Sequence, residues 1–567
     1  MRTLHLPLVL LLVTACAPID IEGPHPAPDE PLRSQLVVMG TTDVHGWLLP
    51  YDYTAGEEVG FGLARLVPVI DSIRAAHPGR TALVDSGDLL QGNALAGVYS
   101  DPAARGRGEP HPVIEAMNWL AYDAAAIGNH EFNFGIQFME EVFADAELPF
   151  LAPNIFVHGT DRPAYPQYTI IERQVEGRPL RIGITAGIPP GVLVWDRDHV
   201  LGRLDFPDLV ESIRPLVPRM RAEGAEIIIV AAHNGLEGTS YDTAATGLAL
   251  ENRMADLARE VEGIDVIFLG HTHRELADST INGVLITQAN NLAQSLAVAT
   301  LDIEHDGDRW RAIGKRGEVI RPDPKRSSAE FEAALDHAHQ RTLAHVNRAI
   351  GTTPVAWRAD SARVRDTPII DFINEVQMRV TGADLSSAAA FDLDAVLGPG
   401  EITIAQVNRL YPYDNNTLRA VRITGRDLRM YLERSAEYYH PCPELACEMV
   451  TNRAVPGFNY DIVSGVDYEL DLTRPVGERV TKLERDGQPI RDDDTFTLAL
   501  NNYRQGGGGG FTMVAEAPIV YDEGESIRDL LIAEIERRGE IRPEDYFRES
   551  WRIMPEELVG RAYAEQN

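Results

Sequence analysis

Five short motifs rich in Asp, Asn and His occur in the first half of the chain, each directly after an apolar run. They are Asp43-Val44-His45, Gly87-Asp88, Gly128-Asn129-His130-Glu131, His233-Asn234 and Gly270-His271-Thr272-His273. Carboxylate, amide and imidazole groups are ligands for Zn, Mn or Fe rather than for thiolate-preferring metals. Any single motif also suits a helix cap, a turn or a buried His without a ligand. The five motifs together favour a metal centre.

The apolar runs before these motifs predict the strands that position them. The strand candidates are 36–39, 81–84, 123–127, 150–151, 181–185, 226–231, 266–269 and 284–287. Several are almost wholly apolar, which is typical of strands covered on both faces. Helices are expected between them, for example over 61–76 and 209–223. Because sites in α/β sheets lie beyond the carboxyl ends of the strands, we expect the motifs of a layered α/β domain to converge.

The second half of the chain predicts a connecting helix and a second mixed α/β domain. Strands are expected at 417–423, 467–472 and 495–500, followed by a mostly helical, acidic tail from residue 516. The expected segments are 1–16 (export signal), 17–34 (tether), 35–325 (metal domain), 326–351 (linker helix) and 352–567 (second domain).

The N-terminal segment predicts export. A short basic start is followed by an apolar run to Leu12 and by the small residues before Cys16. This run is too short for a permanent membrane helix, which needs roughly 20 residues. Val13-Thr14-Ala15-Cys16 looks like a bacterial lipobox, in which the Cys is lipidated, and the Pro-rich stretch 24–31 that follows suits a tether better than a buried helix. We therefore expect a lipid-anchored protein of the periplasm or cell envelope.

The charge and the cysteines narrow the function further. The 567 residues carry 52 Lys+Arg against 86 Asp+Glu, a formal charge of -34, which disfavours binding to nucleic acid polymers. Cys442 and Cys447 are the two cysteines besides Cys16. In an oxidising compartment they are expected to form a disulfide, and a metal pair is the less favoured alternative because no further Cys or His cluster lies nearby. Nothing in the sequence indicates an obligate protein partner.

The five motifs resemble those of the calcineurin-like metallophosphatases. From about residue 35 the chain resembles the bacterial 5'-nucleotidase and 2',3'-cyclic-nucleotide 2'-phosphodiesterase/3'-nucleotidase family. The resemblance implies a two-metal N-terminal domain joined by a helix to a substrate-binding domain, with two divalent ions, Zn or Mn. By motif match, Asp43, His45, Asp88 and His273 would hold one ion. Asp88, Asn129, His233 and His271 would hold the other, with Asp88 bridging.

The resemblance also implies a catalytic role for His130. In the family this His stabilises charge on the transferring phosphate or protonates the leaving oxygen. In 5'-nucleotidases it is partnered by an Asp three residues later, within Gly-Asn-His-Glu-Phe-Asp. Here that position is Asn133, as in the cyclic phosphodiesterase branch. An amide does not stabilise an imidazolium as a carboxylate does, so we expect a less basic His130.

Two loops of the second domain resemble the family's base-binding loops. Tyr411-Pro412-Tyr413-Asp414-Asn415 and Asn501-Asn502-Tyr503-Arg504 each carry an aromatic ring, and Gly506 to Gly510 follow the second loop. By match, Tyr413 and Tyr503 would sandwich the base and Asn415 would hydrogen-bond nearby; ordinary surface turns are the alternative. The 5'-nucleotidases more often carry Phe here, so the two Tyr favour the cyclic phosphodiesterase branch.

The expected activity is metal-dependent hydrolysis of nucleoside 2',3'-cyclic phosphates to 3'-nucleotides, and of 3'-nucleotides to nucleoside and phosphate. A 5'-nucleotidase or UDP-sugar diphosphatase is the nearest alternative. A relative that hydrolyses sulfur-oxyanion conjugates is disfavoured by the two Tyr loops, and a nucleotide-binding lipoprotein without turnover by the complete set of ligands. The expected partner is a nucleotide or cyclic nucleotide, with the membrane contacted only through the lipid.

Overall fold

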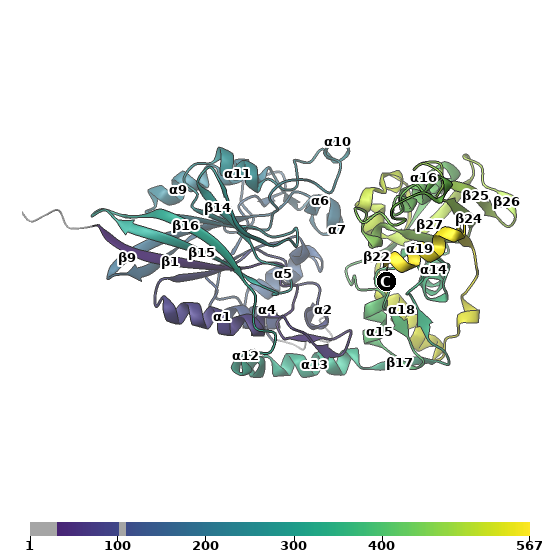
Figure 1. The fold of residues 1–567 in the computed structure, drawn as a ribbon, viewed down its shortest axis with the longest axis horizontal. Coiled ribbons are helices and arrows are strands. Elements are labelled where there is room, and N and C mark those ends of the chain that lie inside the picture. Colours follow the sequence, from purple (N-terminus) through teal and green to yellow (C-terminus); the bar gives the residue numbers. More distant parts are fainter. Residues whose placement is uncertain (1–30, 101–108, 567) are drawn as a thin grey trace, which may run out of the picture.

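The computed structural model describes residues 31–100 and 109–566, so the export signal and Cys16 lie outside the described residues. An N-terminal half (purple to teal) and a C-terminal half (green to yellow) lie side by side along the long axis (Figure 1). Within the described ranges, no helix is both long and apolar enough to cross a bilayer.

Two six-stranded sheets form the N-terminal half. The first sheet has the order β16 (Trp310–Ile320), β15 (Leu296–His305), β1 (Leu32–Thr41), β4 (Thr81–Asp85), β5 (Ala124–Ala126) and β6 (Phe150–Leu151). The second has the order β13 (Leu276–Ile281), β14 (Val284–Gln288), β12 (Val266–Phe268), β11 (Ile227–Ala232), β9 (Arg178–Gly187) and β8 (Tyr168–Val175). The motif-bearing strands run parallel within each sheet. Antiparallel strands form both edges of the second sheet and the β15–β16 side of the first, whereas the other edge strand of the first sheet, β6, pairs parallel with β5.

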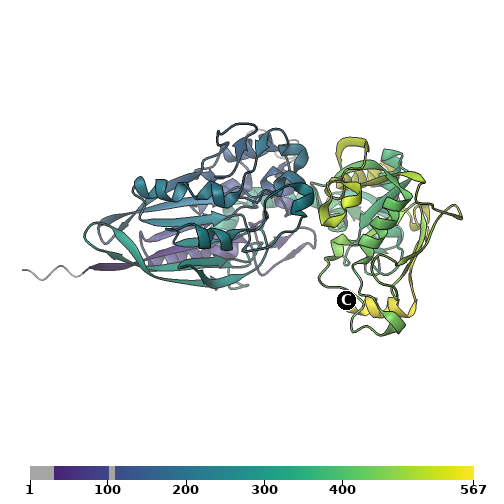
Figure 2. The same ribbon diagram turned by 90° about the horizontal axis from the view of Figure 1, so that it is seen from above.

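The side-chain alternation of β1 shows how the layers are held together. Leu36 and Val38 are buried in the core between the two sheets, whereas Val37 and Met39 face helices on the outer side of the first sheet. Helices α1 (Leu63–Ala76), α4 (Pro112–Trp119) and α5 (Ile136–Phe143) cover that side. Helices α8 (Leu209–Ile213), α9 (Leu216–Ala222) and α11 (Met254–Glu260) cover the second sheet (Figure 2). The predicted layered α/β architecture is confirmed as four layers.

The structure differs from the prediction in several helices. The helix expected over 209–223 is two helices, because Pro215 cannot continue the hydrogen-bond ladder. The linker is also two helices, α12 (Ala329–Ala334) and α13 (Asp336–Val346), which meet at Leu335. In Figure 1 they run beneath the N-terminal half toward the C-terminal half, where β17 (Ala349–Thr353) begins.

A mixed α/β domain forms the C-terminal half. Its five-stranded sheet has the order β23 (Asp461–Ser464), β19 (Leu385–Ala389), β27 (Thr495–Asn501), β22 (Thr417–Thr424) and β28 (Ile519–Ser526). A four-stranded sheet has the order β26 (Gln488–Pro489), β25 (Val480–Arg485), β24 (Asp467–Asp471) and β29 (Trp551–Met554). The longer helices are α14 (Pro368–Thr381), α15 (Ile404–Leu410), α16 (Gly425–Ala436), α18 (Ile527–Arg538) and α19 (Glu557–Gln566), and the short helix α17 (Asn502–Gln505) carries Tyr503. The expectation of a mostly helical tail is wrong, because β28 and β29 complete the two sheets.

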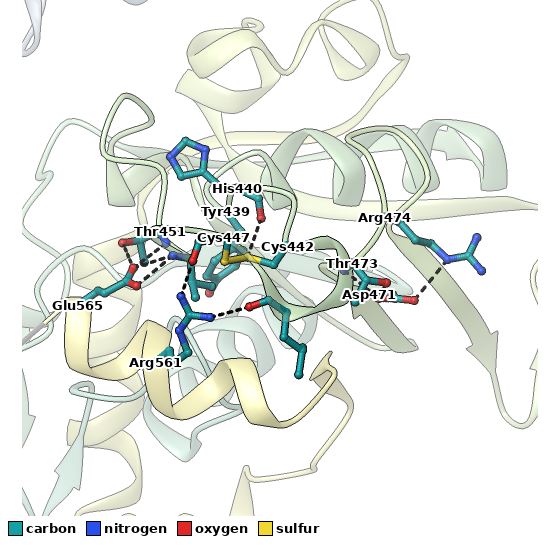
Figure 3. The surroundings of a disulfide bond; sticks show 12 residues. Tyr439, His440, Cys442, Cys447, Thr451, Asp471, Thr473, Arg474, Arg561 and Glu565 are labelled. Atoms are coloured by element: carbon teal, nitrogen blue, oxygen red, sulfur yellow. Dashed lines mark hydrogen bonds and ion pairs between the residues drawn. A yellow bond between two sulfur atoms is a disulfide. The ribbon is translucent and has the colours of Figure 1, made fainter.

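Cys442 and Cys447 are joined by a disulfide with an S–S distance of 2.01 Å. Figure 3 shows the C-terminal helix α19 against this loop. Arg561 of α19 donates hydrogen bonds to the Leu445 carbonyl (3.0 Å) and the Cys447 carbonyl (2.7 Å). Glu565, one turn later, accepts from the Thr451 backbone N–H at 2.8 Å. The disulfide loop therefore anchors the end of the chain.

Candidate active site

The five Asp/Asn/His motifs lie at the carboxyl ends of parallel strands from both sheets of the N-terminal half. Asp43 and His45 follow β1, Asp88 follows β4, Asn129 and His130 follow β5, His233 follows β11, and His271 and His273 follow β12. Neighbouring strands in each sheet are parallel, so their carboxyl ends share one edge. The structure thus brings together all seven predicted metal ligands.

Most of these ligands sit on an unusual backbone. Positive φ angles, which L-residues rarely adopt, occur at Asp43 (50°), His45 (50°), Asp88 (63°), His271 (69°) and His273 (51°). Such conformations cost on the order of 1 kcal/mol or more each and persist where the surrounding structure imposes them. Five positive φ angles in one cluster indicate that the packing of the site imposes the conformation of these loops.

Asp43, His45 and His273 form the first ligand group. Nε2 of His45 lies 3.1 Å from Nε2 of His273, and the latter lies 3.3 Å from Oδ1 of Asp43. Asp43 and His45 are buried and His273 is more exposed. Two imidazole nitrogens and a carboxylate oxygen therefore face one small volume.

Asp88, His233 and His271 form the second group, and Asn129 lies beside it. Oδ2 of Asp88 is 3.1 Å from Nε2 of His233, which in turn is 3.0 Å from Oδ1 of Asn129. The same Asp88 oxygen is 4.0 Å from Nε2 of His45 in the first group. Asp88 is thus the carboxylate between the two groups.

The hydrogen bonds behind the imidazoles show that the residues fit divalent cations. Nδ1 of His45 lies 2.7 Å from the Gln91 carbonyl, and Nδ1 of His233 lies 2.9 Å from the Ser86 carbonyl. Since a carbonyl only accepts, both Nδ1 atoms carry a proton, and both Nε2 atoms face the site, where they would offer a lone pair to a metal ion. This arrangement is typical of His ligands held by a hydrogen bond at the other ring nitrogen.

His271 is oriented in the opposite sense by Glu251. Its Nε2 lies 2.6 Å from Oε1 of Glu251, so Nε2 carries the proton and Nδ1 is left for a ligand. Glu251 is itself fixed by the Ser240 hydroxyl at 2.6 Å. Glu251 could not be recognised from the sequence, because it lies 20 residues from His271 in an irregular segment and no motif spacing connects the two.

Glu131 is a second supporting residue without an assigned role in the sequence analysis. Its carboxylate is buried and accepts hydrogen bonds from the backbone N–H groups of Gly128 (2.6 Å), Asp88 (3.0 Å) and Leu89 (2.6 Å). It joins the loops after β4 and β5. Gly128 is required at this point, since a Cβ there would lie 2.3 Å from Oδ1 of Asp88.

The electrostatics of the cluster also favour a cation. Burial lowers the pKa of His45 to about 4. At His233 burial has the same tendency, but the charge of Asp88 and its hydrogen bond outweigh it and raise the pKa to about 9. Burial raises the pKa of Asp88, and the nearby His233 and His130 hold it well below its usual value. Buried carboxylates in this cluster thus depend on adjacent positive charge.

His130 lies at the edge of the cluster. Its Nε2 is 3.9 Å from Oδ2 of Asp88, and its Nδ1 is 2.6 Å from Oδ1 of Asn133. The net effect on the pKa of His130 is an increase: burial lowers it, but Asp88 and the bond to Asn133 raise it more. This increase is relative to a free imidazole, so the expectation that His130 is less basic than it would be beside an Asp at position 133 stays a prediction.

The two halves enclose a cavity of about 330 Å³. From the N-terminal half it is lined by Asn129, His130, Asn133, Trp195, Asp196, Ser240, Glu251 and His271. From the C-terminal half it is lined by Phe391, Tyr413, Asn415, Asn416, Phe458, Asn501, Asn502, Tyr503 and Arg504. All three predicted substrate-binding residues are among them. Oδ1 of Asn415 is buried without a hydrogen-bond partner among the described residues.

Arg504 and the glycine run hold the Tyr503 loop. The Arg504 guanidinium is buried, lies 2.9 Å and 3.0 Å from the two oxygens of Asp461, and packs 4.4 Å from the centre of the Phe511 ring. Gly508 lets the Tyr503 ring pack against the backbone, since a Cβ there would lie 2.6 Å from that ring. The glycine run thus has a packing function.

Polar contacts across the domain boundary hold the cavity closed. Gln91, next to the metal-ligand loops, donates to Oδ1 of Asp414 at 3.0 Å. Arg419 of β22 pairs across the boundary with Asp198 of α7 (Arg197–Val200), and Asp522 of its own half holds it in place at 3.1 Å. These contacts place the C-terminal loops over the metal-ligand cluster.

Comparison with known proteins supports this arrangement. Residues 36–275 match the calcineurin-like phosphoesterase family, and residues 349–516 match the 5'-nucleotidase C-terminal domain. A Salmonella typhimurium protein named 2',3'-cyclic-nucleotide 2'-phosphodiesterase/3'-nucleotidase is 29% identical over 92% of this chain and 89% of its own. The trifunctional nucleotide phosphoesterase YfkN of Bacillus subtilis is also 29% identical, over 97% of this chain, which spans 40% of that longer protein.

A solved structure with a similar fold agrees with these sequence matches. The crystal structure of a putative 5'-nucleotidase from Staphylococcus aureus superposes with a TM-score of 0.78, covering 92% of this chain and 100% of that one at 24% identity. With the two family matches in the same order and the metal-ligand cluster facing the C-terminal loops, the chain belongs to the 5'-nucleotidase family of calcineurin-like metallophosphoesterases.

Proposed function

We propose that this protein hydrolyses nucleoside 2',3'-cyclic phosphates to 3'-nucleotides, and 3'-nucleotides to nucleoside and phosphate. The observation that carries the proposal is the shared cavity, in which His130 and the metal-ligand cluster face Tyr413 and Tyr503. Its size suits one nucleotide better than a polymer, and the charge of -34 disfavours polyanions. Relatives that carry this activity in their names support the choice of branch.

The residues of the two ligand groups are proposed to hold two divalent ions, Zn or Mn. Asp43, His45 and His273 would hold one ion, and Asn129, His233 and His271 the other, with Asp88 shared. When bound, such a pair supplies Lewis-acid chemistry that lowers the pKa of water and neutralises charge on a phosphate. The chain's own contribution is to fix the imidazole tautomers, as the carbonyls of Gln91 and Ser86 do.

His130 is proposed as the group that contacts the phosphoester. Since Asn133 accepts at Nδ1, Nε2 is the ring nitrogen left to meet a phosphate oxygen or the leaving oxygen. Positioned proton transfer of this kind contributes roughly 10²–10⁴-fold to a rate. Attack of water at phosphorus breaks the bond to one ribose oxygen, and that oxygen takes a proton as it leaves.

Tyr413 and Tyr503 are proposed to stack on the base, and Asn415 to offer its unpartnered oxygen to a donor on the nucleotide. Stacking tolerates different bases because every base has a π-face. The unpartnered oxygen of Asn415 can add selectivity for a group that donates.

Side-by-side assays of 2',3'-cyclic AMP, 3'-AMP and 5'-AMP test the proposal, with the protein stripped by a chelator and then given Zn or Mn. We expect metal-dependent turnover of the first two substrates. A strong preference for 5'-AMP would make the protein a 5'-nucleotidase, and nucleotide binding without phosphate release would make it a receptor. His130→Ala is expected to keep its metal content and to lose at least a hundredfold in kcat.

We further propose export, lipidation at Cys16 and residence in the periplasm or cell envelope, together with the predicted segment boundaries. The Cys442–Cys447 disulfide supports an oxidising compartment. Metabolic labelling with a fatty acid tests the lipidation, with a Cys16→Ala variant as the unlabelled control.

A further inference from the structure

Asp196 is a buried carboxylate in the wall of the cavity for which neither the motifs nor the proposed mechanism has a role. It lies between two short helices, α6 (Val192–Trp195) and α7, and only 6% of it is exposed. Its Oδ1 accepts a hydrogen bond from Nδ2 of Asn133 at 2.7 Å. Its Oδ2 is buried and has no hydrogen-bond partner among the described residues.

Asn133 connects this carboxylate to His130. An amide has an accepting end and a donating end, and an ionised carboxylate only accepts, so Nδ2 of Asn133 must face Asp196. Oδ1 of Asn133 then faces Nδ1 of His130, at 2.6 Å. Because this oxygen only accepts, the His130 proton sits on Nδ1 and its Nε2 is directed to the site. In its ionised form Asp196 thus favours the Nδ1-protonated tautomer of His130, with which it makes no direct hydrogen bond.

The segment around Asp196 is held by contacts on both sides of it. Trp195 packs 5.2 Å from the centre of the His271 ring, and Asp198 pairs with Arg419 of the C-terminal half. Burial raises the pKa of Asp196 to about 7, while His130 and the bond from Asn133 oppose this rise. A buried carboxylate oxygen without a partner is costly and is rarely found where packing alone is required.

We propose that Asp196 is a positioning residue for His130, acting through Asn133, in the phosphoester hydrolysis proposed above. The carboxylate that 5'-nucleotidases place at position 133 is supplied here by another element, one hydrogen bond farther from the imidazole. The inference rests on the proposed role of His130 but not on which nucleotide is the preferred substrate.

A double-mutant cycle with full-length, metal-loaded protein tests the relay. Asp196→Asn keeps the shape of the side chain but lets both amides rotate, so we expect kcat to fall roughly 10–100-fold, with KM and metal content unchanged. In the His130→Ala background the same substitution is expected to change kcat less than about twofold. All variants are assayed with the ester that the wild-type protein hydrolyses fastest. A wrong assignment of the preferred substrate then shows in the wild-type assays and does not affect the comparison between variants.

The control and the rescue variant separate the relay from a general structural effect. Arg197→Gln alters an exposed residue of the same short segment outside the relay, so its effect on kcat is expected to be equal with and without His130. The double variant Asn133→Asp/Asp196→Asn places a carboxylate directly against Nδ1 of His130. We expect it to recover kcat to within about threefold of wild type, which loss of packing at Asp196 would not permit.

An NMR measurement covers the case in which His130→Ala has too little activity for the cycle. In the zinc-loaded protein, ¹⁵N shifts of the His130 ring should show an Nδ1-protonated tautomer, and Asp196→Asn should give a mixture. The proposal is overturned if Asp196→Asn retains wild-type kcat, if its effect persists without His130, or if the tautomer is unchanged. If His130→Ala itself retains full activity, the role of His130 fails, and that of Asp196 with it.

Discussion

The metal-ligand cluster and the base-binding loops meet in one cavity but are built in opposite ways. In the cluster, Asp43 and Asp88 are buried close to each other, and both adopt positive φ. In the loops, Tyr413, Asn415 and Tyr503 have no positive φ, and the charged group beneath them, Arg504, is fully paired with Asp461. The cluster therefore needs a cation to offset its strain and charge, whereas the charged pair of the loops is complete without one, and the uncharged Oδ1 of Asn415 is left for a ligand.

The largest effect is expected at Asp88, the carboxylate shared by the two ligand groups. Asp88→Asn removes the negative charge that faces both His233 and His45. We expect kcat/KM to fall more than a thousandfold, or about 4 kcal/mol, and the bound metal to drop below two ions per chain. Activity assays and elemental analysis measure this, with the exposed Asp71→Asn as the control. Two tightly bound ions and normal turnover in Asp88→Asn would contradict the bridging role.

The Arg504–Asp461 pair tests the claim that the C-terminal loops are stable by themselves. Arg504→Met leaves Asp461 buried without its cation, which is expected to lower the free energy of unfolding by about 3–5 kcal/mol. Urea denaturation followed by fluorescence measures the change. Adding Asp461→Leu should recover part of the loss, since an uncharged pair avoids the buried charge. Metal content should stay at the wild-type level in both variants.

Loss of a stacking ring should affect binding without affecting the metals. Tyr503→Ala is expected to raise KM about 10–100-fold, because base stacking contributes roughly 1–3 kcal/mol. Tyr503→Phe keeps the ring and should stay within about threefold of wild type. Steady-state kinetics on the preferred nucleotide decides this, and an unchanged KM in Tyr503→Ala would mean that the base binds elsewhere.

The smallest effect is expected on the stability of the fold at acidic pH. Glu534 in the C-terminal half is buried; burial raises its pKa, but hydrogen bonds from Arg537, Arg379 and Arg538 outweigh this and lower it from 4.5 to about 2. A carboxyl whose pKa is lower in the folded state stabilises the fold above about pH 4.5. That stabilisation is lost as the pH falls toward about 2. The three Arg are partly exposed, so screening limits the contribution to about 1 kcal/mol.

The measurement is the thermal midpoint of wild type and Glu534→Gln between pH 6 and pH 2.5. The wild-type midpoint should fall more steeply, and the two curves should converge at the acidic end. Parallel curves would mean that Glu534 has the same pKa in the folded and unfolded chain.

Much of the N-terminal half could be predicted from sequence, because strands and ligands are encoded locally. An apolar run followed by Gly and Asp, Asn or His is visible in a window of ten residues, and all eight strand candidates there coincide with observed strands. The strands β15 and β16 were missed, although they are long, as was the division of the linker at Leu335. In the tail, β28 and β29 could not be predicted, because sheet pairing with β22 and β24 determines their conformation.

The sequence by itself determined which side chains gather at the strand ends, since residue type and strand order are sufficient to define them. Only the tertiary structure decided how those side chains are oriented. Glu251 against His271, and Asp196 behind Asn133, are contacts between segments 20 and 63 residues apart that no spacing rule links. The cavity itself exists because two separately encoded halves dock through contacts such as that of Gln91 with Asp414. The residue types of the metal ligands are set by the local sequence. The tautomers of the His ligands, the strain of their backbone and the enclosure of the cavity arise from packing.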